Sequence, residues 1–497
     1  SSNSLINPID GPAMQRAMLF AMLIALGLGQ AAAAIEPSPI VPESKGTFRG
    51  RPTVAAVRVG QAPGIDGYLG DDAWRLAKPA GEFLQKSPNE NIPHSQHTEF
   101  RVVYDDNALY IGVWCFDAEP GRIIAHNMER DGHMFFEDVI YVTLDTFLDR
   151  RNGYSFSINP NSARSDATVS NNTQVNGEWD CAWIARSQQQ AWGWSTEMAI
   201  PFKSISFDER ADTWGLNVSR NIGRAGERGQ WANSRSTSRS YHVSDCGDLT
   251  GLHGLRQGLG LDITPYAIGK YQKDYDASDS DLLGEFGFDV RYRLTPSLTA
   301  MTSVNTDFAE TEIDRRQINL TRYPLFFPEK RQFFLEDSGI FGFGGGESSK
   351  RRSRDSSDTL LMPFFSRRIG LSSEEQSKGK IVPIQFAGKV TGRVGDYNIG
   401  LLDAVLDGED SPRNAFVGRV SRNVFEQSSV GFLTTIGDPN SDEMNTVTGI
   451  DFQHRDSDFM GGHTFELNLY ALGSHSEENG GIDPAWGAST KLYDRNI

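Results

Sequence analysis

The sequence predicts an all-β protein in two parts, an antiparallel β-sandwich followed by an antiparallel β-barrel of the outer-membrane type. Three observations lead to this fold class. The 50 glycines are spread along all 497 residues among many aromatic and β-branched residues, a composition that favours strands joined by many turns. Short strand-like runs recur between turn residues over residues 54–255. Beyond residue 259 the runs alternate regularly between apolar and polar side chains, a pattern typical of membrane-spanning strands.

The first part is predicted to be a sandwich because its strand-like runs come in pairs separated by short turns. One hairpin is expected around residues 105–107 and another around residues 148–152. Pro201 and Phe202 should end a later strand, with one short helical turn over residues 203–206. The predicted strands are, in order, TEFRVVYD, ALYIGVWCFD, DVIYVTLDT, GYSFSINP, WDCAWIARS, GWSTEMAIPF and TWGLNVSRNI.

The second part is predicted to be a barrel because each run is apolar on one face and polar on the other. The run FGFDVRYRL alternates in this way, and so does FAGKVTGRV, which is followed by a tight turn at Gly395 and Asp396. The polar face would line a wet lumen. A second soluble sandwich, with its apolar face inward, would show the same alternation and remains the alternative. Nine or ten strands are expected, and the chain ends mid-pattern in KLYDRNI, so the last hairpins of an even, closed barrel are expected to be missing.

The stretch RYPLFFPEKRQFFLE, residues 322–336, interrupts this alternation. Pro324 and Pro328 exclude it from a central strand. Its phenylalanines are too apolar to lie free in water, and its charges are too costly to face lipid. We therefore expect a segment inserted at residues 306–344 to fold into the lumen, with its charges paired against Asp289, Arg291 or Arg293. The residues expected to lie in the lumen are Phe326, Phe327, Lys330, Arg331, Phe333 and Phe334.

The N-terminal residues predict export. A short basic start at residues 14–16, an apolar run at 17–28 and small residues at 31–34 have the order of a signal peptide; a retained anchor helix is the alternative. The expected division is residues 1–34 for upstream residues and signal peptide, 35–53 for a Pro-rich linker, 54–255 for the sandwich and 256–497 for the incomplete barrel. The expected location is the outer membrane of a Gram-negative-type bacterium.

The three cysteines indicate a fold that does not depend on disulfides, although export leads to an oxidising compartment. Cys115 lies in an apolar run and is expected to be a buried thiol. Cys181 and Cys246 could form a pair or remain free.

Charge and motifs exclude several functions. The net charge of −17 argues against a nucleic-acid partner. The basic run at residues 348–357 is interpreted as a solvated loop, with a contact to lipid headgroups as the alternative. The sequence contains no serine-nucleophile elbow, His-Glu zinc motif or phosphate-binding loop. No pair of carboxylates is singled out for glycoside hydrolysis. An enzymatic role is therefore not expected.

The first part resembles the family-nine carbohydrate-binding modules. The resemblance rests on IDGYLGDDAW at residues 65–74, FRVVYDDNALYIGVWCFD, FFEDVIYVTLDT and GWSTEMAIPFKSI, and it covers nearly all of residues 54–255. Members of that family hold a sugar between two tryptophan rings, whose faces suit the C–H patch of a pyranose while polar groups bind its hydroxyls. The association of such modules with O-glycosyl hydrolases does not by itself supply a catalytic site.

The resemblance implies a carbohydrate site at three residues. The first tryptophan position of the family falls on Phe135 and the second on Trp231, and a polar position is retained as Asn159. The arginine of the family falls on Ser157, and its glutamate falls on Tyr141. The aromatic platform is therefore implied without its charged partners. A scaffold sandwich, with Phe135 and Trp231 used for packing, is the alternative.

Two further groups of residues have structural interpretations. Trp179 and Trp183 are expected to pack in the core. The loop HNMERDGHMFFED carries six metal-binding residue types, His126, Glu129, Asp131, His133, Glu137 and Asp138, but their spacing matches no zinc motif. No cofactor is expected, although the resemblance leaves a structural calcium site open.

The whole chain resembles a family of uncharacterised bacterial outer-membrane proteins with a family-nine-type module followed by a barrel. This resemblance rests on the run TDFAETEIDRRQINLTRYPLFFPEKRQFFLEDSGIFGFG at residues 306–344, with WGLNVSRNIGR and EMAIPFKSISF in support. It implies a cell-envelope carbohydrate-binding protein, with a glycan and outer-membrane lipid as partners, linked to carbohydrate uptake or catabolism. A channel or envelope-assembly protein, whose sandwich is a plug or docking module, is the alternative; a glycosyl hydrolase is the least favoured.

Overall fold

The computed structural model describes residues 51–493 with gaps, and the predicted signal peptide and most of the linker lie outside the described residues. The longest gaps are 307–328, 346–360 and 371–381. The shorter ones are 171, 173, 178, 234, 236, 257–259, 275–278, 296, 330, 409–411, 426, 440–443, 461–462 and 478–479.

Residues 51–256 form a sandwich of two β-sheets, as the sequence predicts. One sheet has the strand order β1-β14-β12-β6-β7-β8-β9, with β13 and β3 joined to it through β12, and the other has the order β10-β11-β5-β4-β2. The strands are β1 (Thr53–Ala55), β2 (Val57–Arg58), β3 (Leu84–Ser87), β4 (Thr98–Tyr104), β5 (Ala108–Phe116), β6 (Val139–Asp145), β7 (Gly153–Ile158), β8 (Arg164–Ser170), β9 (Gln174–Asn176), β10 (Ile184–Gln190), β11 (Gly193–Pro201), β12 (Thr213–Ile222), β13 (Glu227–Gln230) and β14 (Gly247–Thr250).

The predicted hairpins are confirmed, but the sandwich is not entirely antiparallel. Strands β4 and β5 pair across residues 105–107, and β6 pairs with β7. In contrast, β1 runs parallel to β14 and β2 runs parallel to β4. The partners in these two pairs are distant in the sequence, so no tight turn forces them to be antiparallel.

The sandwich core lies between the two sheets. Every second residue of β6, namely Ile140, Val142 and Leu144, is fully buried, and Trp194 and Trp214 reach the same core. Trp179 and Trp183 pack there too, with ring centroids 5.2 Å from Tyr154 and 5.0 Å from Phe156, which confirms their predicted structural role. All three cysteines are free thiols.

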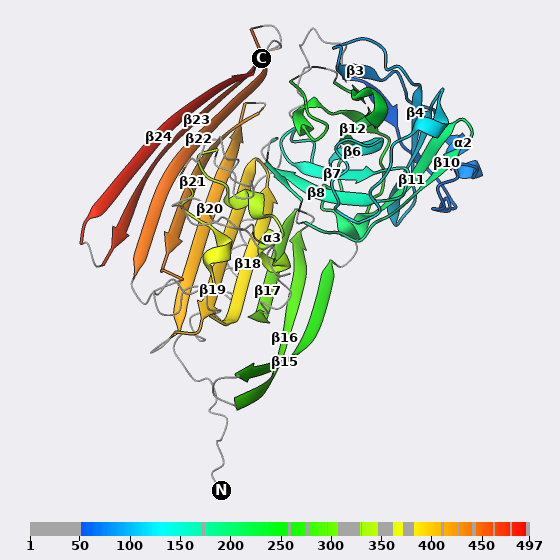
Figure 1. Cartoon of the computed structure of the whole chain (residues 1–497). Helices are drawn as coiled ribbons and strands as arrows, with labels where there is room; N and C mark the ends of the chain where they lie inside the picture. The colour runs from blue at the N-terminus through cyan, green and yellow to red at the C-terminus, as the bar shows by residue number, and fades with distance from the viewer. Residues whose placement is uncertain are drawn as a thin grey trace. The chain divides into compact units, whose positions relative to one another are not determined.

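Residues 261–493 form one antiparallel sheet whose ten strands follow one another in chain order (Figure 1). The strands are β15 (Leu261–Asp274), β16 (Asp279–Thr295), β17 (Leu298–Thr306), β18 (Ile384–Val394), β19 (Tyr397–Leu406), β20 (Arg413–Val424), β21 (Ser428–Ile436), β22 (Asn445–Phe459), β23 (His463–Ser476) and β24 (Ile482–Tyr493). Within the described residues, β15 and β24 do not pair with each other, so the sheet is open rather than a closed barrel.

Helix is scarce in the described part of the chain. The α-helices are α2 (Asp72–Leu76) and α3 (Gln332–Leu335), and the 3-10 helices are η1 (Pro120–Arg122), η2 (Phe202–Ser204), η3 (Gly223–Ala225), η4 (Val243–Asp245), η5 (Ser338–Phe341) and η6 (Ser366–Arg368). None of the helices in the described residues has the length and apolarity needed to cross a bilayer.

Candidate functional site

The loop between η1 and β6, residues 123–138, carries two neighbouring aromatic side chains on its surface; we call it the aromatic loop. Phe135 is 52% exposed and Phe136 is 81% exposed. Their ring centroids lie 5.0 Å apart and their planes meet at 86°, the edge-to-face arrangement that aromatic pairs favour. Neighbouring aromatic side chains that are exposed to solvent are typical of a surface that binds a ligand or another protein.

Asn159 holds the aromatic loop in place rather than facing solvent. Its Nδ2 donates to Glu137 Oε2 at 2.8 Å and to the Asn127 carbonyl at 2.9 Å. Its Oδ1 accepts from the backbone N–H groups of Asn161 and Ala163. Because Asn159 is fully buried, it fixes the conformation of the loop and is not itself open to a ligand.

Two further contacts make the base of the aromatic loop rigid. Asp138 accepts hydrogen bonds at Oδ2 from the backbone N–H groups of Ile124 (3.0 Å) and Gly223 (3.2 Å). Met134 turns inward and packs against Val139 and Ala163. The exposed rings are therefore presented by a loop whose base is held by hydrogen bonds and apolar packing, which lowers the entropy cost of binding a partner.

Arg228 of β13 lies over the exposed ring of Phe135. The guanidinium carbon is 4.2 Å from the ring centroid, within the range of a cation–π contact. Tyr141 of β6 lies close enough to feel the charge of Arg228: burial raises the pKa of the Tyr141 phenol, Arg228 opposes that rise and Glu137 adds to it. The phenol is therefore neutral and can both donate and accept a hydrogen bond.

Trp231 does not join Phe135 at this surface. It is 9% exposed and belongs to the sandwich core, where it packs edge-on against Phe100 with centroids 5.2 Å apart. Ser157, at the arginine position of the family, is also buried. The exposed aromatic pair consists instead of Phe135 and Phe136. The adjacent phenylalanines in the sequence could have indicated Phe136, but nothing in the sequence connects Arg228 with them.

The acidic residues of the aromatic loop do not form a metal site. Among the described residues, no group of three or more His, Cys, Asp or Glu side chains is arranged to hold a metal ion. Both oxygens of Glu137 already accept hydrogen bonds, from the backbone N–H of Asn127 and from Asn159. We therefore derive no role for calcium at this loop.

His94 and Glu227 form a buried pair beside β13, with His94 Nε2 3.4 Å from Glu227 Oε1 and side chains 2% and 6% exposed. Burial lowers the pKa of His94 to about 4, although Glu227 opposes that shift. The folded protein therefore favours the neutral form of His94. The resulting stabilisation is fully present above the pKa of a histidine in the unfolded chain, about 6.5, and is lost as the pH falls towards 4.

We therefore expect the free energy of unfolding of the full chain to decrease between pH 7 and pH 5, with a contribution from His94 of at most about 1.4 kcal/mol per pH unit. His94→Leu should flatten this dependence, because leucine takes up no proton. Denaturant unfolding at several pH values measures the effect. Identical slopes for the two proteins would contradict the assignment.

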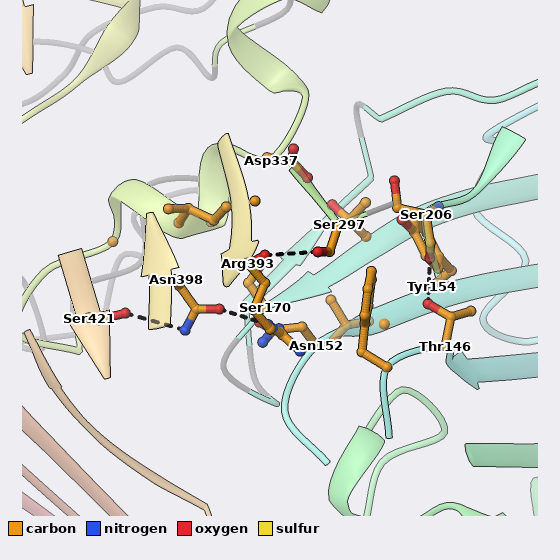
Figure 2. A pocket seen from close by; sticks show the side chains of 18 of the residues that line it. Thr146, Asn152, Tyr154, Ser170, Ser206, Ser297, Asp337, Arg393, Asn398 and Ser421 are labelled. Atoms are coloured by element: carbon orange, nitrogen blue, oxygen red, sulfur yellow. Dashed lines mark hydrogen bonds between the residues drawn. The ribbon is translucent and has the colours of Figure 1, made fainter. Parts of the chain in front are cut away.

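A polar cavity of about 100 Å³ lies between the sandwich and the ten-stranded sheet. Figure 2 shows hydroxyl, amide and guanidinium groups from both parts around it. Arg393 Nε donates to Asn398 Oδ1 at 3.0 Å, and Ser297 Oγ donates to the Arg393 carbonyl at 2.8 Å. On the sandwich side, the backbone N–H of Ser206 donates to the Tyr154 hydroxyl at 3.0 Å.

The charged groups around this cavity are paired within the protein. Arg393 Nη2 lies 2.5 Å from Asp149 Oδ2, and Asp337 accepts from Thr391 Oγ1 at 2.8 Å. Arg151, also from the sandwich, donates to Ser429 Oγ at 3.0 Å and to the Ser428 carbonyl. These contacts fasten the sandwich to the sheet, and we assign no ligand to the cavity.

The described part of the inserted stretch, residues 329 and 331–345, covers the polar face of the sheet; we call it the inner segment. Arg331 and Glu329 form a buried ion pair of 2.7 Å. Arg291 of β16 pairs with Glu336 at 3.2 Å, so one of the expected partners of the charged stretch contacts it. The ammonium of Lys389, on β18, donates to the carbonyls of Phe333 and Glu336.

Phe333 and Phe334 pack as the sequence analysis expects. They are 2% and 3% exposed and belong to a cluster with Leu402 and Ala404 of β19 and Val417 of β20. Arg331 Cζ lies 4.1 Å from the Phe334 ring centroid. The other residues expected in the lumen, Phe326, Phe327 and Lys330, lie outside the described residues, and the lumen itself remains a prediction because the described sheet is open.

Comparison with known proteins gives two family matches, which cover separate parts of the chain. Residues 65–245 match the family described as "Carbohydrate family 9 binding domain-like", which confirms the resemblance of the first part. Residues 258–423 match the family described as "Domain of unknown function (DUF5916)". The comparison with curated proteins gives no match.

Two similar solved structures show a carbohydrate binding module of family 9 from Caldicellulosiruptor kristjanssonii. The complex with cellotriose is 18% identical, covers 41% of this chain and 95% of its own, and has a TM-score of 0.32. The complex with glucose is 16% identical, covers 40% of this chain and 95% of its own, and has a TM-score of 0.31.

Proposed function

We propose that this chain is a cell-envelope protein that binds a glycan through the aromatic loop of its sandwich. The observation that carries the proposal is the exposed pair of Phe135 and Phe136 on a loop whose base is held by the hydrogen bonds of Asn159 and Asp138. The flat face of a phenylalanine ring suits the C–H patch of a sugar, and a rigid loop binds at a low entropy cost. The match of residues 65–245 to family 9 domains supports the same function.

The polar groups beside the two rings differ from those of the family. Tyr141 stands at the glutamate position of the family, and the guanidinium of Arg228 comes from β13 rather than from the arginine position at Ser157. The proposed site therefore combines two aromatic rings, one phenol and one guanidinium. Among the described residues around the two rings, we identify no pair of carboxylates placed for glycoside hydrolysis. We therefore propose that the site binds a glycan without hydrolysing it.

We further propose that the ten-stranded sheet is part of an outer-membrane barrel. Its outward side chains are apolar and exposed, among them Phe286 (64%), Phe432 (45%) and Ile450 (60%), whereas inward polar residues such as Lys389 (2%) and Arg419 (2%) are buried. An apolar face of this extent is unfavourable in water and favourable against lipid chains. Its exposed large residues include Phe288, Tyr292, Leu294, Val394, Val420, Val430, Ile436, Leu469 and Trp486.

The location can be tested by fractionation of cells that express the full-length protein. We expect the protein in the outer-membrane fraction, with heat-modifiable migration on a gel, because a closed barrel resists detergent until it is heated. Recovery in the soluble periplasmic fraction would refute the membrane proposal and leave the glycan proposal standing.

A second candidate function is a channel or assembly protein in which the sandwich and the inner segment close the lumen. The contacts of Asp149 and Arg151 with the sheet and the coverage of its polar face by the inner segment favour it. Conductance of the full-length protein in planar bilayers would distinguish this function from simple anchoring of the sandwich.

The glycan-binding proposal predicts that Phe135→Ala and Phe136→Ala each weaken glycan binding by the full chain about 10- to 100-fold, because each removes an apolar contact worth about 1.5–3 kcal/mol. A glycan array followed by titration calorimetry with the bound glycan measures the change.

The matched control is Tyr68→Ala, which removes another exposed aromatic side chain of the sandwich (57% exposed) and should leave binding unchanged. Trp231→Ala is not a clean test, because it empties a core position and destabilises the fold. Unchanged binding in both phenylalanine variants would refute the proposed site.

A further inference from the structure

We propose that the aromatic loop selects an acidic glycan, one that carries carboxylate, phosphate or sulfate groups, and that Arg228 provides this selectivity. The inference rests on the proposed glycan-binding function and names the ligand class of the same site. The juxtaposition that carries it is an arginine without a hydrogen-bond partner lying over an exposed aromatic ring.

Arg228 is held in position without being neutralised. Its guanidinium carbon is 4.2 Å from the Phe135 ring centroid, and its side chain makes no hydrogen bond or ion pair with the residues that the structure describes. A guanidinium stacked on a ring keeps the N–H groups along its edge available, and this planar edge matches a carboxylate, phosphate or sulfate in a bidentate geometry.

Other cations near Arg228 add to the positive potential. The pKa of Lys86 is lowered to about 8. Burial is the main cause, the positive charges of Arg239 and Arg228 add to it, and Asp245 opposes the shift. Arg239 is exposed. The carboxylate of Asp245 accepts from Ser238 Oγ at 2.7 Å. The chain as a whole carries a net charge of −17, so a local group of cations is unusual in it. A neutral ligand would not require such a group.

Three of the four carboxylates in the aromatic loop already have partners within the protein. Both oxygens of Glu137 accept bonds within the loop, Asp138 accepts two backbone N–H groups, and Asp131 lies 3.4 Å from Arg130. A sugar hydroxyl donates as well as accepts, so a neutral sugar needs acceptors in its site. A site with free guanidinium donors, in which most carboxylates already have partners, suits the oxygens of an anionic group, which only accept hydrogen bonds.

The test uses the full chain in detergent and pairs of probes that differ in charge: oligogalacturonate with its methyl ester, and dextran sulfate with dextran. We expect the charged member of each pair to bind more tightly, with a preference that decreases as salt is added. Arg228→Gln should weaken binding of the charged members by about tenfold more than it weakens binding of the neutral members, so the preference for charge is lost. Arg228→Lys should recover part of the loss, because lysine keeps the charge and loses the planar edge.

The control is Arg75→Gln, which removes an exposed arginine on α2 (side chain 77% exposed) and should not alter the preference. Equal binding of charged and neutral probes, or an unchanged preference in Arg228→Gln, would overturn this inference and leave the proposed glycan binding intact. If neither Phe135→Ala nor Phe136→Ala weakens any of the probes that bind, the proposed glycan site fails as well.

Discussion

Asp451→Ala is expected to loosen the inner segment from the ten-stranded sheet, with a cost of about 3–5 kcal/mol. Asp451 on β22 and Arg419 on β20 are 4% and 2% exposed, and their side chains are joined at 2.5 and 3.0 Å. Asp451 also accepts the backbone N–H of Gly344 at 3.0 Å. Without the carboxylate, Arg419 becomes a buried charge without a partner. Because this charge is more stable in water, the variant favours states in which the inner segment moves away from the sheet and exposes Arg419.

The reaction of a cysteine with a maleimide measures this change. Ser338→Cys places a thiol in the half-buried η5, and Cys181→Ser removes the one native thiol that is not buried. A cost of 3–5 kcal/mol corresponds to roughly 10²- to 10⁴-fold more frequent opening, so labelling should accelerate by a similar factor.

Two variants serve as controls for this prediction. Asp451→Asn keeps an acceptor for Gly344 and removes the charge, so it should give an intermediate rate. Asp483→Ala removes an exposed carboxylate from β24 and should have no effect. A labelling rate in Asp451→Ala equal to that of the parent protein would show that the ion pair does not hold the inner segment.

Arg393→Ala is expected to release the sandwich from the sheet, again with a cost of about 3–5 kcal/mol, because it leaves Asp149 buried without its counter-charge. Arg393 Nη2 lies 2.5 Å from Asp149, whose side chain is 8% exposed, and its guanidinium lies 5.1 Å from the Phe147 ring. Burial alone would raise the pKa of Asp149, but Arg393 and the N–H groups of residues 151 and 152 outweigh it and hold that pKa below its usual range.

The sign of the pH dependence follows from this lowered pKa. Asp149 stabilises the junction above its unfolded pKa of about 4, and the stabilisation is lost as the pH falls through the lower folded pKa. Arg393→Ala raises the pKa of Asp149, so the junction of the variant should fail at a higher pH than that of the parent protein.

Spin labels at Arg210 of the sandwich and Met460 of the sheet, both strongly exposed, would report on the junction. We expect a narrow distance distribution in the parent protein and a broad one in Arg393→Ala. Arg422→Ala is the matched control, because Arg422 stacks on Tyr397 of the sheet and no hydrogen bond or ion pair connects its side chain to the described sandwich. An unchanged distribution in Arg393→Ala would contradict the assigned role of this pair.

The aromatic loop shows where prediction from sequence was sufficient and where it was not. Phe135 is predicted as a surface aromatic residue from the family resemblance, and the structure exposes it. Trp231 has the same residue type as its family counterpart, yet it packs in the core against Phe100. Arg228 is 93 positions away from Phe135 in the sequence, so only the placement of β13 beside the aromatic loop brings them together.

The sequence by itself determined the strands, the hairpins and the two faces of the ten-stranded sheet, because alternation with a period of two is a local property of a strand. It placed Phe286 and Phe288 on one face and Arg291 on the other, and it indicated that Phe333 and Phe334 would be buried. Only the tertiary structure decided that Arg419 pairs with Asp451, that Arg393 reaches Asp149, and that the described strands form an open sheet. These contacts join residues far apart in the chain, and their formation depends on strand register and packing, which no local pattern encodes.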